Sequence, residues 1–215
     1  MPENAPQIKR KATEGYGAQI VPCAPTVAAR ETMLEAVLAR TGAVFIHPYN
    51  DYNVIAGQAT AAKELLDDVA DLDAVIAPIG GGGLMSGTAL STRYLSPGTK
   101  IFGAEPTEVN DAYRSLKAGK IEVNETTNTI ADGLRTNLGE KTFDIISQHI
   151  DDIFTVSEEE IVQAMRLVWE RMKIIIEPSC AVPLAAVLRH REVFAGRRVG
   201  IILSGGNVDL DHLPF

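Results

Sequence analysis

The sequence predicts an α/β fold in which a mainly parallel sheet carries helices on both faces. Helix-like and strand-like segments alternate almost from end to end of the 215 residues, as they do in parallel sheets. Short runs such as AVIAPI, residues 74–79, are wholly apolar, as expected of a strand that is covered on both faces. Hydrophobic residues make up 46% of the chain and charged residues 22%, which is enough to bury a sizeable core.

The first predicted elements alternate between helix and strand. Residues 5–16 are expected to form a helix, because a proline lies in the first turn and a glycine follows the last. Residues 28–40 have the amphipathic pattern of a second helix. The apolar runs AQIVPC, residues 18–23, and AVFIHP, residues 43–48, are expected to form strands, the second of them buried.

A second series of two helices and two strands follows. Residues 54–69 are rich in alanine and acidic residues, and they predict a helix that leads into the strand at 74–79. Four glycines then separate this strand from a helix expected at residues 84–95. KIFGAE, residues 100–105, is expected to form the next strand.

The last half of the chain continues the alternation. DIFTV precedes a helix with an acidic start, in which Ser157 and Glu160 have the spacing of a capping box. A polar stretch that ends near residue 139 is expected to be irregular. Helices are expected at residues 111–118, 139–149, 157–172 and 180–194, and a final strand at 198–206.

Composition disfavours several classes of function. A net charge of −8 disfavours nucleic acid or an anionic membrane as a partner. No apolar run approaches the ~20 residues of a membrane-spanning helix, and the N-terminus has no apolar stretch typical of a secretory signal. Cys23 and Cys180 lie far apart and form no C-x-x-C pair, so we expect a reducing, cytoplasmic location without disulfides or a zinc site.

The strongest chemical signal is the glycine loop, Gly80-Gly81-Gly82-Gly83, between a predicted strand and a predicted helix. Glycines adopt positive φ readily and let the backbone approach a ligand closely. The helix that follows begins with unpaired N–H groups and the positive end of its dipole. Together these features predict an anion site that is best suited to a phosphate group.

Two other interpretations of the loop stay open. A dinucleotide-binding fold has an acidic residue after the next strand, and Glu105 lies about 20 residues beyond the loop. However, the G-x-G-x-x-G pattern would need glycine in place of Met85 or Ser86, and no Gly-Lys-Ser/Thr follows the loop. A tight turn without a ligand is the other interpretation, although four glycines carry a large entropic cost for a turn alone.

At this loop the sequence resembles a known family. PIGGGGLMSG resembles the phosphate-binding loop of fold type II pyridoxal-phosphate (PLP) enzymes, and the terminal SGGNVDL resembles that of serine racemases and serine/threonine dehydratases (ammonia-lyases). The resemblance implies a tryptophan synthase β-like fold and a lyase or isomerase of amino-acid metabolism that acts on a small amino acid. Further collinear matches, which cover essentially the whole chain, are HPYND, IAGQ, AEP, TIADGL, DDIFTVSEEEI, LVWERMK and IIEPSCAV.

The resemblance also implies a cofactor site. Gly80, Gly81, Gly82 and Gly83, together with Leu84, would hold the phosphate of PLP through backbone amides.

On the same resemblance, Ser204 would form a hydrogen bond with the pyridine nitrogen, and Glu177 would lie near the cofactor ring. From the residues alone, Ser204 could instead cap a turn at a strand end. Glu177 could equally be a charge at the start of a helix.

A divalent-cation site is implied in the same way. Glu105, Asp111 and the carbonyl of Val109 match the cation site of the serine racemase group, where hard oxygen ligands suit Mg²⁺ or Ca²⁺. Solvated surface acids are the alternative. His47, Pro48 and Asn50 match a segment that contacts a nucleotide effector in some members, but we expect buried strand-end residues there.

One part of the family pattern has no counterpart in this sequence. The family forms a Schiff base through a lysine in an S-x-K-x-R-G segment near its N-terminus, and no such segment is present. The first residue aligns with an internal residue of the family's smaller domain. We therefore expect a truncated chain, with residues 1–50 as a remnant of the small domain and residues 51–215 as most of the large PLP-binding domain.

The resulting hypothesis is the C-terminal part of a PLP-dependent dehydratase of serine, threonine or 3-hydroxyaspartate, or of a serine racemase. The complete enzyme would be a homodimer. Because the catalytic lysine is missing, this chain alone is expected to show little or no turnover. A non-catalytic partner or remnant of a full-length subunit is one alternative, and an NAD-dependent oxidoreductase that uses the loop and Glu105 is another.

Overall fold

The computed structural model describes the backbone of residues 1–215 and every side chain except that of Val27. The chain divides into two compact units. The first unit comprises Met1–Ile46 and Asn207–Pro214, and the second comprises His47–Gly206 and Phe215. The boundary expected near residue 50, as one between a small and a large domain, stays a prediction.

The first unit contains two helices close to the predicted ranges, α1 (Gln7–Gly15) and α2 (Val27–Thr41). Thr26 caps the start of α2, because its hydroxyl oxygen accepts a hydrogen bond from the Ala29 amide at 3.1 Å. Gly42 ends α2 in the left-handed conformation, at φ +68°.

The two strands predicted at residues 18–23 and 43–48 are wrong. The chain has no regular structure there, apart from one isolated parallel bridge between Pro2 and Cys23. Val44 and Ile46, expected to be buried, are 86% and 70% exposed. An apolar run becomes a strand only beside another strand, which must supply partners for its backbone N–H and C=O groups. Among the described residues of the first unit, no strand is present to do so.

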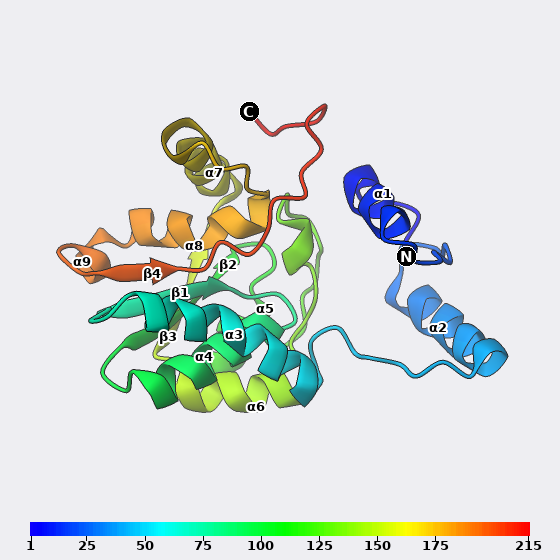
Figure 1. The fold of residues 1–215 in the computed structure, drawn as a ribbon, viewed down its shortest axis with the longest axis horizontal. Helices are drawn as coiled ribbons and strands as arrows, with labels where there is room; N and C mark the ends of the chain where they lie inside the picture. Colours follow the sequence, from blue (N-terminus) through cyan, green and yellow to red (C-terminus); the bar gives the residue numbers. More distant parts are fainter. The chain divides into compact units, whose positions relative to one another are not determined.

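The second unit is built around a parallel sheet of four strands in the order β3-β2-β1-β4 (Figure 1). Ala74 is paired with Lys100 on one side and with Val199 on the other, and Phe102 is paired with Asp152. The carboxyl ends of all four strands therefore lie at one edge of the sheet. The strands are β1 (Ala74–Pro78), β2 (Lys100–Pro106), β3 (Asp152–Val156) and β4 (Val199–Ile201).

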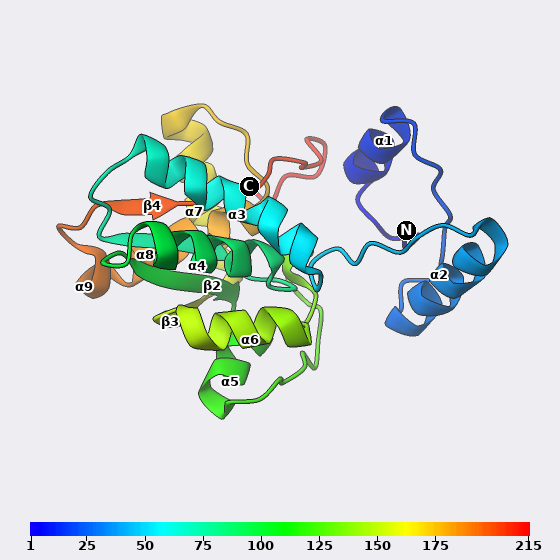
Figure 2. The same cartoon turned by 60° about the horizontal axis from the view of Figure 1, so that its bottom comes forward.

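Helices cover both faces of this sheet, which confirms the predicted fold class. The helices α3, α4 and α6 lie on one face, and α7 and α8 lie on the other (Figures 1 and 2). The helical elements of this unit are α3 (Tyr52–Asp68), α4 (Gly83–Leu95), α5 (Asp111–Ala118), the 3₁₀ turn η1 (Asp132–Leu134), α6 (Glu140–His149), α7 (Glu158–Met172), α8 (Pro178–Arg189) and α9 (Arg191–Phe194).

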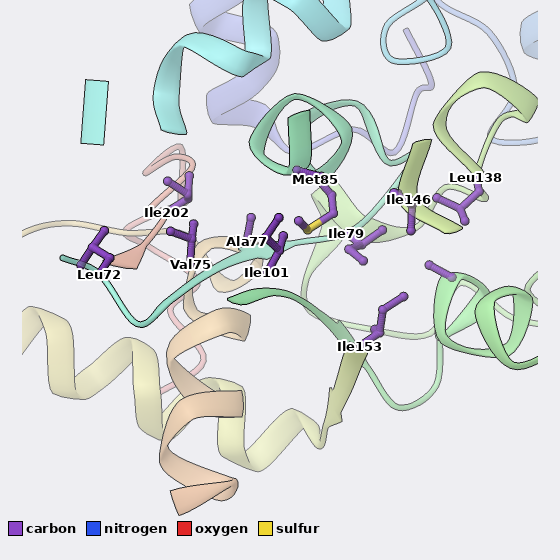
Figure 3. Packing of buried hydrophobic residues seen from close by; sticks show 12 residues of the cluster. Leu72, Val75, Ala77, Ile79, Met85, Ile101, Leu138, Ile146, Ile153 and Ile202 are labelled. Atoms are coloured by element: carbon purple, nitrogen blue, oxygen red, sulfur yellow. The ribbon is translucent and has the colours of Figure 1, made fainter. Parts of the chain in front are cut away.

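One cluster of the hydrophobic core lies between the sheet and the helices α4 and α6. All five residues of β1 are buried, as the apolar run predicted. Figure 3 shows Met85 of α4 against Ala77 and Ile101 of the two central strands. Burial of these apolar side chains stabilises the sheet edge on which the glycine loop begins.

Two late elements differ from the prediction. The helix expected over residues 180–194 is broken at His190, which leaves the helical conformation (φ −99°, ψ 52°), and its ring stacks on Phe154 with 4.5 Å between centroids. The strand expected over residues 198–206 has only the three residues of β4, because no neighbouring strand continues its pairing beyond the bond from Ile202 N to Ile76 O. The predicted capping box of α7 is confirmed.

Among the helices of the described residues, none is both long and apolar enough to cross a membrane.

Candidate functional site

A cavity of about 370 Å³ opens at the carboxyl ends of β1 and β4 in the second unit. Ligands of open parallel sheets bind at this edge, because helix N-termini and strand-end loops meet there. The cavity is lined by Pro48, Tyr49, Gln58, Pro78, Gly80, Gly81, Gly82, Gly83, Leu84, Gly133, Leu134, Thr136, Glu177, Ser179 and Ser204.

The glycine loop connects β1 to α4, and its conformation excludes side chains. A Cβ atom on Gly80 would lie 2.9 Å from the carbonyl oxygen of Gly133, and one on Gly81 would lie 2.3 Å from the ring of Tyr49. Gly82 has φ +86°, which other residues rarely adopt. The backbone therefore follows a path that only glycine permits.

This path brings the backbone of the loop to the start of α4. Gly82 is the N-cap of α4, and Gly83 is its first residue. The amides of the first turn of a helix have no carbonyl partner within the helix, and the helix dipole makes this end positive. The amides of Gly83 and Leu84 belong to this turn, so the loop and the helix form a site with the properties that bind phosphate.

Thr142 of α6 holds the glycine loop in place through hydrogen bonds. Its hydroxyl donates to the carbonyl oxygen of Gly81 at 2.8 Å, and its oxygen accepts from the amide of Gly139 at 2.9 Å. The Thr142 side chain is fully buried. One hydroxyl group thus connects the glycine loop to the first turn of α6.

The opposite wall of the cavity is the start of α8 together with the loop after β4. Glu177 is the N-cap of α8, and its amide donates to the carbonyl of Gly205 at 3.1 Å. The hydroxyl oxygen of Ser179 accepts from the amide of Gly133 at 3.0 Å. Ser204 lies next to Gly205, so these backbone contacts hold it at the rim of the cavity.

The structure brings together all the residues that were expected to bind the cofactor: Gly80 to Gly83, Leu84, Glu177 and Ser204 line one cavity. Sequence reasoning gave no role to Tyr49, Gln58, Gly133, Thr136 and Ser179, which line it as well. Four of the five lie inside segments that carry the family resemblance, namely HPYND, IAGQ, TIADGL and IIEPSCAV. The resemblance was therefore the signal that could have identified them.

The expected cation ligands lie in another part of the unit, from the end of β2, which includes Glu105, to Asp111 at the start of α5. The carboxylate of Glu105 accepts hydrogen bonds from the amides of Ala112 and Tyr113, at 3.2 and 2.8 Å. The carboxylate of Asp111 accepts from the Asn124 side chain at 2.6 Å and from the Leu138 amide at 2.8 Å.

Both acids are buried and interact with each other, so they are not solvated surface acids. Burial, together with the neighbouring Asp111, raises the pKa of Glu105 well above its ordinary value, and burial raises the pKa of Asp111 to about 6. Val109, whose carbonyl was expected to be the third ligand, is also buried. Among the described residues, no three His, Cys, Asp or Glu side chains form a metal cluster.

The lining of the cavity limits the chemistry that it can perform. Among the side chains that the structure describes, no lysine lines it.

A second hollow of about 410 Å³ lies between α7 and α8, but two of its charged side chains, Arg189 and Glu160, pair with each other at 2.8 Å. No glycine of the described residues lines this second hollow, so the cavity at the glycine loop is the better candidate site.

Comparisons with known proteins agree with this geometry. A family model described as "Pyridoxal-phosphate dependent enzyme" matches residues 1–205. The chain is 51% identical to a β-hydroxyaspartate dehydratase of Paracoccus denitrificans, over the whole chain and 68% of that protein. It is 48% identical to a serine racemase of Dictyostelium discoideum, over 99% of the chain and 67% of that protein.

A solved structure of similar fold is a T.th. threonine deaminase, with a TM-score of 0.91 and 44% identity. The match covers 97% of this chain and 69% of the deaminase. These matches confirm the fold type II that was expected from the sequence, and the chain spans about two thirds of the length of its relatives. The chain therefore belongs to the pyridoxal-phosphate dependent enzyme family.

Proposed function

We propose that this chain binds pyridoxal 5′-phosphate in the cavity at the glycine loop. The observation that carries the proposal is the convergence of Gly80 to Gly83, the first turn of α4, Glu177 and Ser204 on one cavity at the carboxyl edge of the sheet. The loop admits only glycine, because a Cβ atom on each of Gly80 to Gly83 would lie within 3.0 Å of another protein atom. The amides at the start of α4, which follow this loop, supply the donors that a phosphate needs.

Different residues of this chain would bind different parts of the cofactor. The amides of Gly80 to Gly83 and Leu84 would hold its phosphate, and the hydroxyl of Ser204 would meet its pyridine nitrogen. Glu177 would lie near the ring. When bound, pyridoxal phosphate serves as an electron sink for the chemistry of amino acids. A neutral hydroxyl at Ser204 does not force protonation of the ring nitrogen as a carboxylate would, so it moderates this sink.

The reaction that we propose for the enzyme is the dehydration of a hydroxy amino acid (serine, threonine or 3-hydroxyaspartate) or the racemisation of serine. The names of the relatives support this choice. For the isolated chain we propose little or no turnover, because among the described side chains no lysine lines the cavity. The same observation favours a non-catalytic partner of a full-length subunit as the second candidate.

The oxidoreductase alternative has less support. It requires the carboxylate of Glu105 to reach the ribose of a nucleotide. Glu105 is only 1% exposed, and its oxygens accept hydrogen bonds from the amides of Ala112 and Tyr113 at the start of α5. A ribose could reach this group only after α5 had moved.

The test of the proposed function is the binding of pyridoxal phosphate by equilibrium dialysis. We expect saturable binding to the chain, and a loss of at least about tenfold in Gly82→Ala, because alanine is strained at φ +86° and meets Leu138 and Thr142. Gly98→Ala is the matched control, since nothing lies within 4 Å of its added Cβ. Equal affinity of the two variants would refute the proposal.

The activity is tested separately. The chain is incubated with pyridoxal phosphate and with serine, threonine or 3-hydroxyaspartate, and the keto acid and ammonia are measured, with chiral chromatography for racemisation. We expect at most a trace of product. Turnover at the rate of a typical enzyme, about 10 s⁻¹, would refute the proposal that the lack of a lysine in the cavity prevents catalysis.

We propose in addition that Glu105, Asp111 and the carbonyl of Val109 bind Mg²⁺ or Ca²⁺. Two buried carboxylates with raised pKa values fit a cation, because its charge would offset their repulsion, and hard oxygen ligands suit both ions. We expect millimolar Mg²⁺ or Ca²⁺ to raise the melting temperature of the chain but not that of Asp111→Asn. An equal response of the two proteins would refute this site.

The assembly and the location are also proposals. The family resemblance supports a homodimer, which sedimentation equilibrium of the complete enzyme would test against a monomer. The cysteines Cys23 and Cys180 are both free and buried, which supports the reducing environment of the cytoplasm. Fractionation of cells with an antibody against the chain would test the location.

A further inference from the structure

Tyr49 lines the cavity without a role in the proposed function, and its side chain lies directly against the glycine loop. Three ring atoms of Tyr49 would be the nearest neighbours of a Cβ atom on Gly81, at 2.3 to 2.4 Å. A Cβ atom on Gly83 would lie 3.0 Å from Cβ and 3.1 Å from Cα of the same tyrosine. The ring therefore fills the space that a side chain on Gly81 would need.

His47 fixes both the backbone and the ring of Tyr49. Its Nδ1 atom accepts hydrogen bonds from the amides of Tyr49 and Asn50, at 3.3 and 2.9 Å. The rings of His47 and Tyr49 meet edge to face with 4.6 Å between their centroids, which is a favourable arrangement for aromatic rings. These contacts restrict the orientation of the tyrosine ring against the loop.

The first turn of α6 holds both the segment of Tyr49 and the glycine loop. The amide of Lys141 donates to Oδ1 of Asn50 at 2.9 Å, and its Nζ atom donates to the Asn50 carbonyl at 3.3 Å. The next residue, Thr142, donates to the carbonyl of Gly81. Gly81 is thus held through its carbonyl by Thr142, while the Tyr49 ring packs against its Cα.

Gly81 and Gly82 exclude a side chain for different reasons. Gly82 has φ +86°, and its added Cβ would also meet Leu138 and Thr142. The φ of Gly81 lies outside the left-handed region, so its backbone conformation is one that other residues adopt. At Gly81, therefore, the Tyr49 ring rather than the backbone conformation excludes a side chain.

We propose that Tyr49 is a positioning residue: its ring packs on Gly81 and holds the glycine loop in the conformation that presents its amides to the phosphate of pyridoxal phosphate. This inference rests on the proposed cofactor site. Glycine has more backbone freedom than any other residue, so a run of four loses much entropy when it is ordered around a ligand. A loop that is already ordered by Tyr49 binds without that loss.

The experiment measures the dissociation constant for pyridoxal phosphate and the ³¹P NMR shift of the cofactor at saturation. Tyr49→Ala should weaken binding at least about tenfold and move the ³¹P signal, because the amides around the phosphate are no longer held in place. Tyr49→Phe keeps the ring and should restore both readouts. Tyr49→Leu, which keeps an apolar side chain but no ring, replaces Tyr49→Ala if alanine prevents folding.

Double variants separate this contact from a general loss of stability. Gly81→Ala places its Cβ against the Tyr49 ring and should weaken binding at least about tenfold. In the Tyr49→Ala background the same change should cause little further loss, because the obstructing ring is absent. Gly82→Ala is the matched control. Its strain comes from φ +86° and from Leu138 and Thr142, so it should weaken binding by the same factor in both backgrounds.

The outcomes separate the two proposals. If the unchanged chain binds no pyridoxal phosphate, the proposed cofactor site fails and this inference fails with it. If the chain binds the cofactor but Tyr49→Ala has the same affinity and ³¹P shift, only the inference about Tyr49 is wrong. Tighter binding by Tyr49→Ala would show that the ring obstructs the cavity, and it would overturn the inference as well. So would an equal loss from Gly81→Ala with and without the ring, or a Tyr49→Phe variant that binds no better than Tyr49→Ala.

Discussion

Replacing Thr142 by valine tests whether one buried hydroxyl holds the glycine loop in place. Valine has nearly the same shape as threonine but cannot form the bonds to the carbonyl of Gly81 and the amide of Gly139. Each lost hydrogen bond costs about 1 kcal/mol, and a buried group left without a partner adds to this. We therefore expect Thr142→Val to lower the free energy of unfolding by about 2–3 kcal/mol.

The assay is urea denaturation followed by the fluorescence of Trp169, the single tryptophan of the chain, which lies in α7 of the same unit as Thr142. A loss of this size corresponds to a fall of about 5–10 °C in melting temperature for a domain of 150–250 residues. Thr142→Ser keeps the hydroxyl and removes only a methyl group, so it should cost about 1 kcal/mol.

Two results would refute the reasoning about Thr142. One is a valine variant within about 0.5 kcal/mol of the unchanged protein, the scatter of ordinary surface substitutions. The other is a serine variant that loses as much stability as the valine variant, because the methyl group rather than the hydroxyl would then be important.

Four further substitutions have expected effects on stability, each measured by urea denaturation. Gly87→Ala should destabilise by about 1–3 kcal/mol, because its Cβ would lie 2.5 Å from the amide nitrogen of Ala59. Gly57→Ala, in open space, should stabilise by about 0.5–1 kcal/mol, and a reversed order would contradict this account of helix packing. Ser157→Ala removes the cap of α7 and should cost about 1 kcal/mol; an unchanged midpoint would exclude a role for the cap. Burial acts to raise the pKa of Asp151, but hydrogen bonds and basic neighbours outweigh it and lower the pKa, so its contribution is present above about pH 4 and is lost as the pH falls through the lowered value. Asp151→Asn should therefore cost about 1 kcal/mol at about pH 7 and progressively less as the pH falls below about 4; an equal loss at every pH would show that the charge is irrelevant.

The fold was predictable where the signals are local or where an apolar run is buried on both faces. The capping box of Ser157 and Glu160 marked the start of α7, and the run at residues 74–79 marked β1. The runs at residues 18–23 and 43–48 have the same apolar character but form no strand. Whether such a run pairs depends on a second strand elsewhere in the chain, which a local pattern cannot reveal.

The candidate site was predictable only in part, for a related reason. The glycine loop carries its own signal, because four consecutive glycines between a strand and a helix carry a large entropic cost for a turn alone. Ser204 and Glu177 were found only through the family resemblance. Thr142 acts on another residue of the site rather than on a ligand. Its partner Gly81 lies 61 residues away in sequence, and only the fold brings the two together.

The order of the strands has a consequence for the way this chain folds during synthesis. β1 is a central strand, but its neighbour β4 pairs Val199 with Ala74, 125 residues further along the chain. At about 5–20 residues per second, a ribosome needs roughly 6–25 s to produce that partner. Until then one edge of β1 is exposed on the nascent chain, so the last strand to emerge is the one that covers this edge and makes β1 a central strand.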